Sequence, residues 1–240
     1  MQKGIKTNKG TYKYNFTPIF EGIKKIDKNI ANENLILFKE ICDRNGLTFL
    51  LFFGTLLGAV REHDFIAHDE DIDLIMDKKD MSQFLNMLFE LRENGFELAR
   101  YERRGFLSII RKGEYIDIYF YHPYENDPEL TNSCRILWEK MYNEDIAPIT
   151  FLGHEYMAPR DYETCLELFY GKDWRTPLQY FHYKQSKTER IKQYIIQYLK
   201  TLAPVSLVEK MQQKKDQPSI DKYLRRISER KTQNLNSKNL

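Results

Sequence analysis

Three aspartates alternate along a short acidic and apolar stretch in the first third of the chain. Asp69, Asp71 and Asp73 lie in the run Asp-Glu-Asp-Ile-Asp-Leu-Ile-Met. Residues two apart on a β-strand point to the same face, so a strand here would present a row of carboxylates. Carboxylate oxygens are the ligands that a hard divalent cation such as Mg²⁺ prefers. The spacing therefore indicates metal-dependent phosphoryl-transfer chemistry.

A Gly-Thr turn lies 17 residues before Asp71 and could supply the second half of such a site. Gly54 and Thr55 follow an apolar run and precede a short predicted helix over 55–61. Backbone N–H groups at the start of a helix favour a phosphate. Arg61, at the other end of that helix, is a candidate for neutralising charge on a transferred phosphate, and a surface arginine is the alternative.

Asp117 is a lone carboxylate in the apolar and aromatic run Tyr115–Tyr121. An unpaired charge inside a buried strand is costly, so this side chain needs either a metal ion or a basic partner. With Asp71 and Asp73 on a neighbouring strand, Asp117 would complete a three-carboxylate metal site. An arginine partner remains the alternative.

A calcium-binding EF-hand loop is excluded, although the three alternating aspartates match its first, third and fifth positions. The sixth position requires glycine and is Leu74, and the twelfth requires glutamate and is Asp80.

The elements expected around these residues form an α+β pattern, with helices covering a small mixed sheet. Helices are predicted over 29–44, 81–93, 162–170 and 188–202, and strands over 47–53, 71–76, 96–101, 106–111 and 115–121. Residues 1–28 are expected to be an N-terminal lead-in that is loosely ordered over 1–17, residues 29–183 the catalytic domain, and residues 184–240 a basic helical C-terminal extension.

Composition is that of a soluble protein, with 42% hydrophobic and 30% charged residues. No apolar run of transmembrane length is present, and three scattered cysteines favour a reducing, cytoplasmic setting. Residues 184–240 hold fourteen basic and five acidic residues, a net charge of +9, whereas the remainder carries −7. We expect the amphipathic helix over 188–202 to pack on the core, and the basic tail beyond it to allow peripheral contact with the inner membrane face.

Two stretches resemble the LicD family, which includes bacterial phosphocholine transferases and fukutin-related ribitol-phosphate transferases. The first runs from Gly-Thr-Leu-Leu-Gly-Ala-Val-Arg to Asp-Glu-Asp-Ile-Asp-Leu, and the second covers residues 158–177. The resemblance spans about residues 34–177. The Gly-Phe-Ile-Pro-Trp common in the family is replaced here by Asp64-Phe-Ile-Ala-His68. That departure leaves the carboxylates in place, but the sequence does not identify the group that is transferred.

The resemblance implies a nucleotidyltransferase-like fold that binds Mg²⁺, or Mn²⁺, and a CDP-linked donor. By position, Asp71, Asp73 and Asp117 would be the metal-binding catalytic residues, Asp69 an auxiliary acid, and Gly54, Thr55 and Arg61 would contact the nucleotide. The family transfers a phospho-alcohol to a hydroxyl of a glycan or lipid-linked oligosaccharide and releases CMP. Nucleic acid is not expected as a partner.

Two other functions remain open on the sequence alone. One is a metal-dependent glycosyltransferase, since an Asp-x-Asp pair also binds the diphosphate of a nucleotide sugar. That class normally has a longer nucleotide-binding half before its Asp-x-Asp than the roughly 70 residues present here. The other is a nucleotidyltransferase or a catalytically silent binding module of the same fold, against which the intact Asp71, Asp73 and Asp117 argue.

Overall fold

A mixed nine-stranded sheet forms the centre of the computed structural model, which describes residues 2–17, 24–177 and 186–238. Seven strands follow the order β10-β11-β3-β4-β7-β6-β5, and β8 and β9 extend the far end of β7. Their bounds are β3 Leu50–Leu51, β4 Ile72–Asp77, β5 Glu97–Glu102, β6 Phe106–Arg111, β7 Glu114–Tyr124, β8 Asp127–Ser133, β9 Ile136–Glu139, β10 Ile146–Phe151 and β11 His154–Pro159. The expected α+β class, a mixed sheet flanked by helices, is confirmed.

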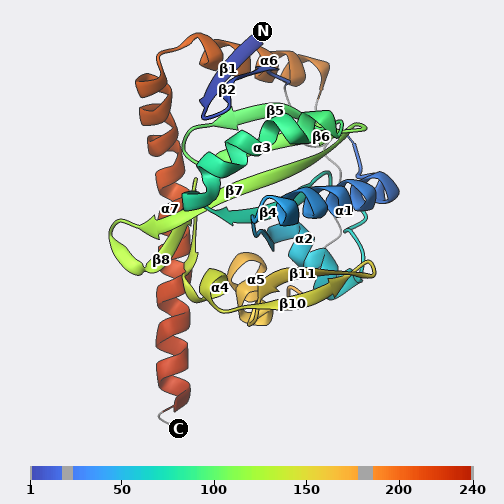
Figure 1. The fold of residues 1–240 in the computed structure, drawn as a ribbon. Coiled ribbons are helices and arrows are strands. Elements are labelled where there is room, and N and C mark those ends of the chain that lie inside the picture. The colour runs from blue at the N-terminus through green and yellow to red at the C-terminus, as the bar shows by residue number, and fades with distance from the viewer. Residues whose placement is uncertain (1, 18–23, 178–185, 239–240) are drawn as a thin grey trace.

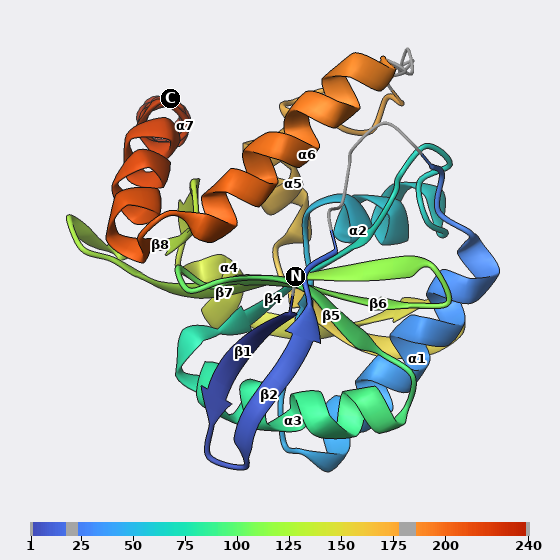
Figure 2. The same ribbon diagram turned by 90° about the horizontal axis from the view of Figure 1, so that it is seen from above.

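Helices lie on both faces of the sheet, with α1 and α3 on one face and α2 and α5 on the other (Figures 1 and 2). Their bounds are α1 Lys28–Arg44, α2 Phe53–Leu57, α3 Met81–Glu93, α4 Met141–Glu144, α5 Tyr162–Tyr170, α6 Lys187–Leu202 and α7 Val205–Lys238. A π-helical turn, Gly58–Glu62, continues α2, and a 3₁₀ turn, Lys78–Asp80, precedes α3. Within the described chain, none of these helices is both long and apolar enough to cross a membrane.

The helix boundaries follow capping residues that the sequence supplies. The carboxylate of Asp27 accepts hydrogen bonds from the N–H groups of Asn29 and Ile30 at the start of α1. The carboxylate of Asp161 accepts from the N–H of Thr164 at the start of α5. The predicted helices over 81–93 and 162–170 agree with α3 and α5 at both ends.

The buried strands β4 and β7 are parallel neighbours at the middle of the sheet. Ile72, Leu74, Ile116 and Ile118 are fully buried, on the opposite face from Asp73 and Asp117 because side chains alternate along a strand. The strand predicted over 47–53 is shorter than expected. Only Leu50 and Leu51 pair in β3, since Phe53 already begins α2.

The N-terminal segment is a β-hairpin, so the expectation of a loosely ordered lead-in is wrong for these residues. Strands β1 (Gln2–Thr7) and β2 (Gly10–Asn15) pair antiparallel. The hairpin packs on α3 through the fully buried ring of Tyr12, whose centroid lies 5.2 Å from that of Phe89. The alternation of Tyr12 and Tyr14 with polar residues was the available strand signal.

The two C-terminal helices differ in how they pack on the rest of the molecule. Helix α7 (red in Figure 1) runs along one side of the molecule, and Ile227 on it is only 3% exposed. Helix α6, which we expected to pack on the core, instead leaves its apolar residues about half exposed: Ile191, Tyr194, Ile195, Ile196 and Leu199. The proposed domain boundary at 183 lies outside the described residues.

Candidate active site

Four polar residues form one row across four neighbouring strands. Asp73 on β4 lies opposite Asp117 on β7, Asp117 lies opposite Ser108 on β6, and Ser108 lies opposite Arg100 on β5. Residues that are opposite one another in a ladder share a face of the sheet. The two predicted metal-binding aspartates on strands are therefore neighbours, on the face that α2 covers.

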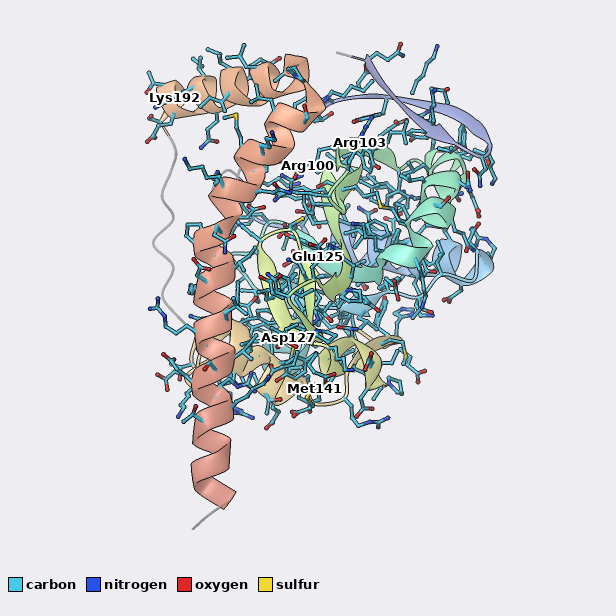
Figure 3. The ribbon with its side chains drawn as sticks, turned by 90° about the vertical axis from the view of Figure 1, so that its left-hand side faces the viewer. Arg100, Arg103, Glu125, Asp127, Met141 and Lys192 are labelled. Carbon is cyan, nitrogen blue, oxygen red and sulfur yellow. The ribbon has the colours of Figure 1, made fainter. Side chains whose placement is uncertain are left out.

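Asp117 is held by two side chains of this row. Nη2 of Arg100 donates to Oδ2 of Asp117 at 2.7 Å, and the hydroxyl of Ser108 donates to Oδ1. Nε of Arg100 also donates to Oγ of Ser108 at 2.7 Å, so one guanidinium fixes both partners. Asp117 is 2% exposed, and Arg100 lies toward the α6–α7 side of the sheet (Figure 3). The arginine partner considered for this buried aspartate is thus present.

Gly54 and Thr55 hold Asp73 in place. The N–H of Gly54 donates to Oδ2 of Asp73 at 3.1 Å, and Oγ1 of Thr55 accepts from the N–H of Asp73 at 2.8 Å. A Cβ at position 54 would lie 2.7 Å from Oδ2 of Asp69 and 3.1 Å from Oδ2 of Asp73, so only glycine fits between the two carboxylates. The N–H that we expected to face a phosphate is directed at Asp73 here.

The carboxylates lie close enough together to raise one another's pKa values. Burial raises the pKa of Asp69 to about 6. The pKa values of Asp71 and Asp73 are raised well above their usual range, first by burial and then by neighbouring carboxylates, Asp117 among them. The guanidinium of Arg100 opposes this shift for both residues. Asp71 precedes β4 by one residue rather than lying on it.

A divalent cation fits this chemistry, although its ligands are not preassembled. Four carboxylates gather here, the guanidinium of Arg100 offsets part of their negative charge, and their oxygens are hard ligands. Within the described chain, however, no three acidic, histidine or cysteine side chains converge as a ready set of ligands. Both oxygens of Asp117 already accept hydrogen bonds, and this is one reason why its carboxylate does not converge with the others.

The turn before Gly54 is strained and is held by aromatic packing. Phe53 has a φ of 43°, which is unfavourable for a residue with a side chain. Its ring lies edge-on to Tyr119 and Phe169, with centroids 5.1 and 5.0 Å away. Packing from β7 and α5 therefore fixes the backbone that presents Gly54 to Asp73.

Residues 46–161 match the family model LicD/FKTN/FKRP, nucleotidyltransferase domain. The matched range contains Gly54, the acidic row, Arg100, Ser108 and Asp117. The chain carries a LicD-family domain. The predicted family is confirmed, and the match ends near the start of the second stretch that we compared, 158–177.

One curated relative is the lipopolysaccharide cholinephosphotransferase LicD of Haemophilus influenzae (strain ATCC 51907 / DSM 11121 / KW20 / Rd), which is 36% identical over 53 residues. That alignment covers 22% of this chain and 20% of the relative, so the two share a short segment of their lengths.

Solved structures of antibiotic-modifying enzymes also resemble the chain. The lincomycin-bound lincosamide adenylyltransferase LnuA has a TM-score of 0.40 at 13% identity and covers 66% of this chain and 91% of its own. The resistance factor ANT(2'')-Ia has a TM-score of 0.42 at 13% identity and covers 86% and 99%. Likeness at this level says nothing about the substrate of the LicD-family domain.

Arg61 connects the two LicD-like stretches. Its Nη1 donates to the backbone oxygen of Trp174 at 3.0 Å, and its Nε pairs with Glu62 at 2.8 Å. With 11% of its side chain exposed, Arg61 supports the turn after α2 against the segment that follows α5. Its contact with a nucleotide stays a prediction.

The sequence did not single out two residues of the LicD-family site, Arg100 and Ser108. Arg100 and Ser108 lie on strands that were predicted, but the pairing register that aligns them with Asp117 is a property of the folded sheet. Tyr119 is two residues from Asp117 on the same face, because side chains alternate along a strand. Burial, followed by nearby Asp73 and Asp117, raises the pKa of its phenol.

Proposed function

We propose that the chain is an Mg²⁺-dependent transferase that moves a phospho-alcohol from a CDP-linked donor to a hydroxyl of a cell-surface glycan, with release of CMP. Mn²⁺ is the expected substitute ion. The observation that carries the proposal is the pairing of Asp73 with Asp117 across β4 and β7, inside the segment that matches the LicD family. The short alignment to a lipopolysaccharide cholinephosphotransferase supports a phosphocholine-like group and a glycan acceptor.

Asp71, Asp73 and Asp117 are the residues that would hold the ion. Ser108 and Arg100 orient the carboxylate of Asp117, the arrangement by which hydrogen-bond partners behind a metal ligand fix its direction. The N–H of Gly54 orients the carboxylate of Asp73, and the hydroxyl of Thr55 holds the backbone N–H of the same residue. When bound, the ion screens the negative charge of the donor's diphosphate.

In the proposed reaction the acceptor hydroxyl oxygen forms a bond to the distal phosphorus of the donor. The bond from that phosphorus to the CMP oxygen breaks, and CMP leaves with the electron pair. The hydroxyl proton passes to a carboxylate of the site, and Asp117 is our candidate. Asp69, whose pKa of about 6 is close to working pH, is placed beside Asp73 and would support the same step.

Choline is one of several alcohols that the site could accept. The rings of Tyr119 and Phe106 lie 4.7 Å apart on the face that holds Asp117, and aromatic faces stabilise quaternary ammonium groups. The same rings also pack in the core, so ethanolamine, glycerol and ribitol donors are tested beside choline.

The test is incubation of the full chain with Mg²⁺ and, separately, CDP-choline, CDP-ethanolamine, CDP-glycerol, CDP-ribitol and UDP-sugars, with nucleotide release followed by chromatography. CMP release from one CDP-linked donor is expected. UDP release without CMP would overturn the proposal in favour of a glycosyltransferase.

Asp73→Asn and Asp117→Asn should each abolish CMP release, because each removes a negative ligand without changing side-chain size. Asp43→Asn is the matched control, since Asp43 is an exposed partner of Lys39 on α1. Full activity in Asp117→Asn would remove both roles proposed for that residue.

A further inference from the structure

An apolar surface is concentrated on α6 and the first turns of α7. Of the nine large hydrophobic side chains that are exposed in the described chain, seven lie here. We call them the α6 face: Ile191, Tyr194, Ile195, Ile196, Leu199, Leu207 and Met211. Their exposed fractions run from 42% for Ile196 to 61% for Met211. Exposed apolar residues concentrated in one segment mark a candidate binding face rather than ordinary surface.

The α6 face is flanked by positive charge. Between Lys187 and Lys215 the sequence holds seven basic and two acidic residues, a net charge of +5. Lys192, Lys210 and Lys214 are exposed, and Lys192 lies on α6 at the outer end of the molecule (Figure 3). One of the two acids, Glu189, is engaged in the capping box with Ser186. The polar side of this segment therefore carries little negative charge to offset its lysines.

The segment that follows α6 is held against the sheet by side-chain contacts of α7. Asp216 on α7 pairs with Arg104 in the turn between β5 and β6. Nε2 of Gln212 donates to Oε2 of Glu102 at 3.2 Å. Figure 1 places α6 at the top edge of the molecule.

We propose that the α6 face binds an anionic lipid surface, with α6 lying in the plane of the headgroups. An amphipathic helix with a charged polar side and bulky apolar residues on the other is suited to this interface. Lysines near an anionic membrane add roughly 1 kcal/mol each, which is about fivefold in binding per residue. Protein interfaces, by contrast, are depleted of lysine.

The charge arrangement favours lipid over a second copy of the chain. The α6 face of another molecule would bring the same lysines close together, with few acids to pair with them. An anionic lipid surface meets both requirements at once, since it accepts the apolar side chains and compensates the lysines. The proposal is independent of the transferase activity, because α6 lies outside residues 46–161.

The test is co-sedimentation of the full chain with vesicles of phosphatidylcholine alone and of phosphatidylcholine mixed with phosphatidylglycerol. Binding to the mixed vesicles is expected, with a steep decrease as salt is raised. Ile195→Asn with Leu199→Asn should lower that binding at least tenfold. Met141→Asn is the matched control, because Met141 is 46% exposed on α4, away from the α6 face.

A second set of variants tests the contribution of the lysine charges to vesicle binding. Lys210→Gln with Lys214→Gln should lower binding to the mixed vesicles by roughly 25-fold, whereas Lys222→Gln, further along α7, should change it little. Circular dichroism of each variant checks folding, which these exposed positions should not disturb. Equal binding to neutral and anionic vesicles, or none to either, would overturn the proposal. So would a dimer in sedimentation velocity that Ile195→Asn dissociates, since that assigns the α6 face to a protein interface.

Discussion

The guanidinium of Arg100 donates to Oδ2 of Asp117 at 2.7 Å although the two residues lie two strands apart. The side chain of Arg100 extends across β6, where its Nε donates a hydrogen bond to Oγ of Ser108. The direction of the central carboxylate is therefore set from β5, at the edge of the sheet. Arg100 is therefore expected to act on activity through the orientation of Asp117.

Arg100→Lys tests this arrangement. Lysine keeps the positive charge but lacks the planar fork that bonds Ser108 and Asp117 together. We expect the Mg²⁺ concentration for half-maximal CMP release to rise about 10–100-fold, the range for loss of a partner behind a metal ligand. Arg103→Lys, an exposed arginine in the adjacent turn, is the control (Figure 3). A lower turnover at unchanged Mg²⁺ dependence would instead indicate direct contact between Arg100 and the substrate.

Gly54→Ala should inactivate the enzyme while leaving it folded. The added methyl would lie 2.7 Å from Oδ2 of Asp69 and 3.1 Å from Oδ2 of Asp73, so those carboxylates must move. We expect a loss of at least about 100-fold in kcat, because displacements of this size at a reacting centre have that effect. In the control, Gly153→Ala, the φ of 80° causes strain but nothing lies within contact distance. Equal activity in the two variants would contradict the close approach at Gly54.

Asp69→Asn should stabilise the metal-free protein at neutral pH. The folded-state pKa of Asp69 is about 6 against a usual 3.8, so the folded protein binds this proton more tightly than the unfolded chain. The contribution of Asp69 to the free energy of unfolding therefore falls as pH rises from about 3.8 to about 6, and stays low above that. Asparagine keeps the acceptor for the N–H of Glu70 and carries no charge.

The expected gain for Asp69→Asn is about 1–3 kcal/mol at pH 7, and it should shrink toward zero below pH 4. Urea unfolding at both pH values, with a chelator present, measures it. A variant that is no more stable than the parent at pH 7 would show that burial does not penalise the Asp69 carboxylate. If the stabilised variant also releases less CMP, the Asp69 carboxylate is retained for activity at a cost in stability.

Ile227→Ala should show that α7 belongs to the folded unit. Ile227 is 3% exposed, and the neighbouring Arg226 donates to the backbone oxygens of Leu168 and Phe169 at the end of α5. Loss of the buried methyl groups should lower the free energy of unfolding by about 2–5 kcal/mol. Ser228→Ala, at an exposed position one residue along, should stay within about 0.5 kcal/mol. Urea unfolding that leaves Ile227→Ala unchanged would mean that α7 is an independent appendage.

Local sequence patterns predicted the central elements well, because capping residues and strand alternation act over a few positions. Asp27 and Asp161 cap the helices that were expected after them, and the strands that carry Asp73 and Asp117 are present. The hairpins after residue 122 were not predicted, since Pro123 and Pro148 interrupt their alternation. The partnership of Arg100 with Asp117 depends on register, and that is decided by contacts distant in sequence.

Catalytic activity also reports whether the strands are correctly paired, because it depends on the row of Asp73, Asp117, Ser108 and Arg100. Each member meets the next through one ladder, and a slip of one residue in any ladder turns a whole strand over. A molecule with one misaligned strand would therefore lose its active arrangement completely rather than in part. The specific activity of a refolded sample should then report the fraction of molecules whose strands β4 to β7 are all correctly paired.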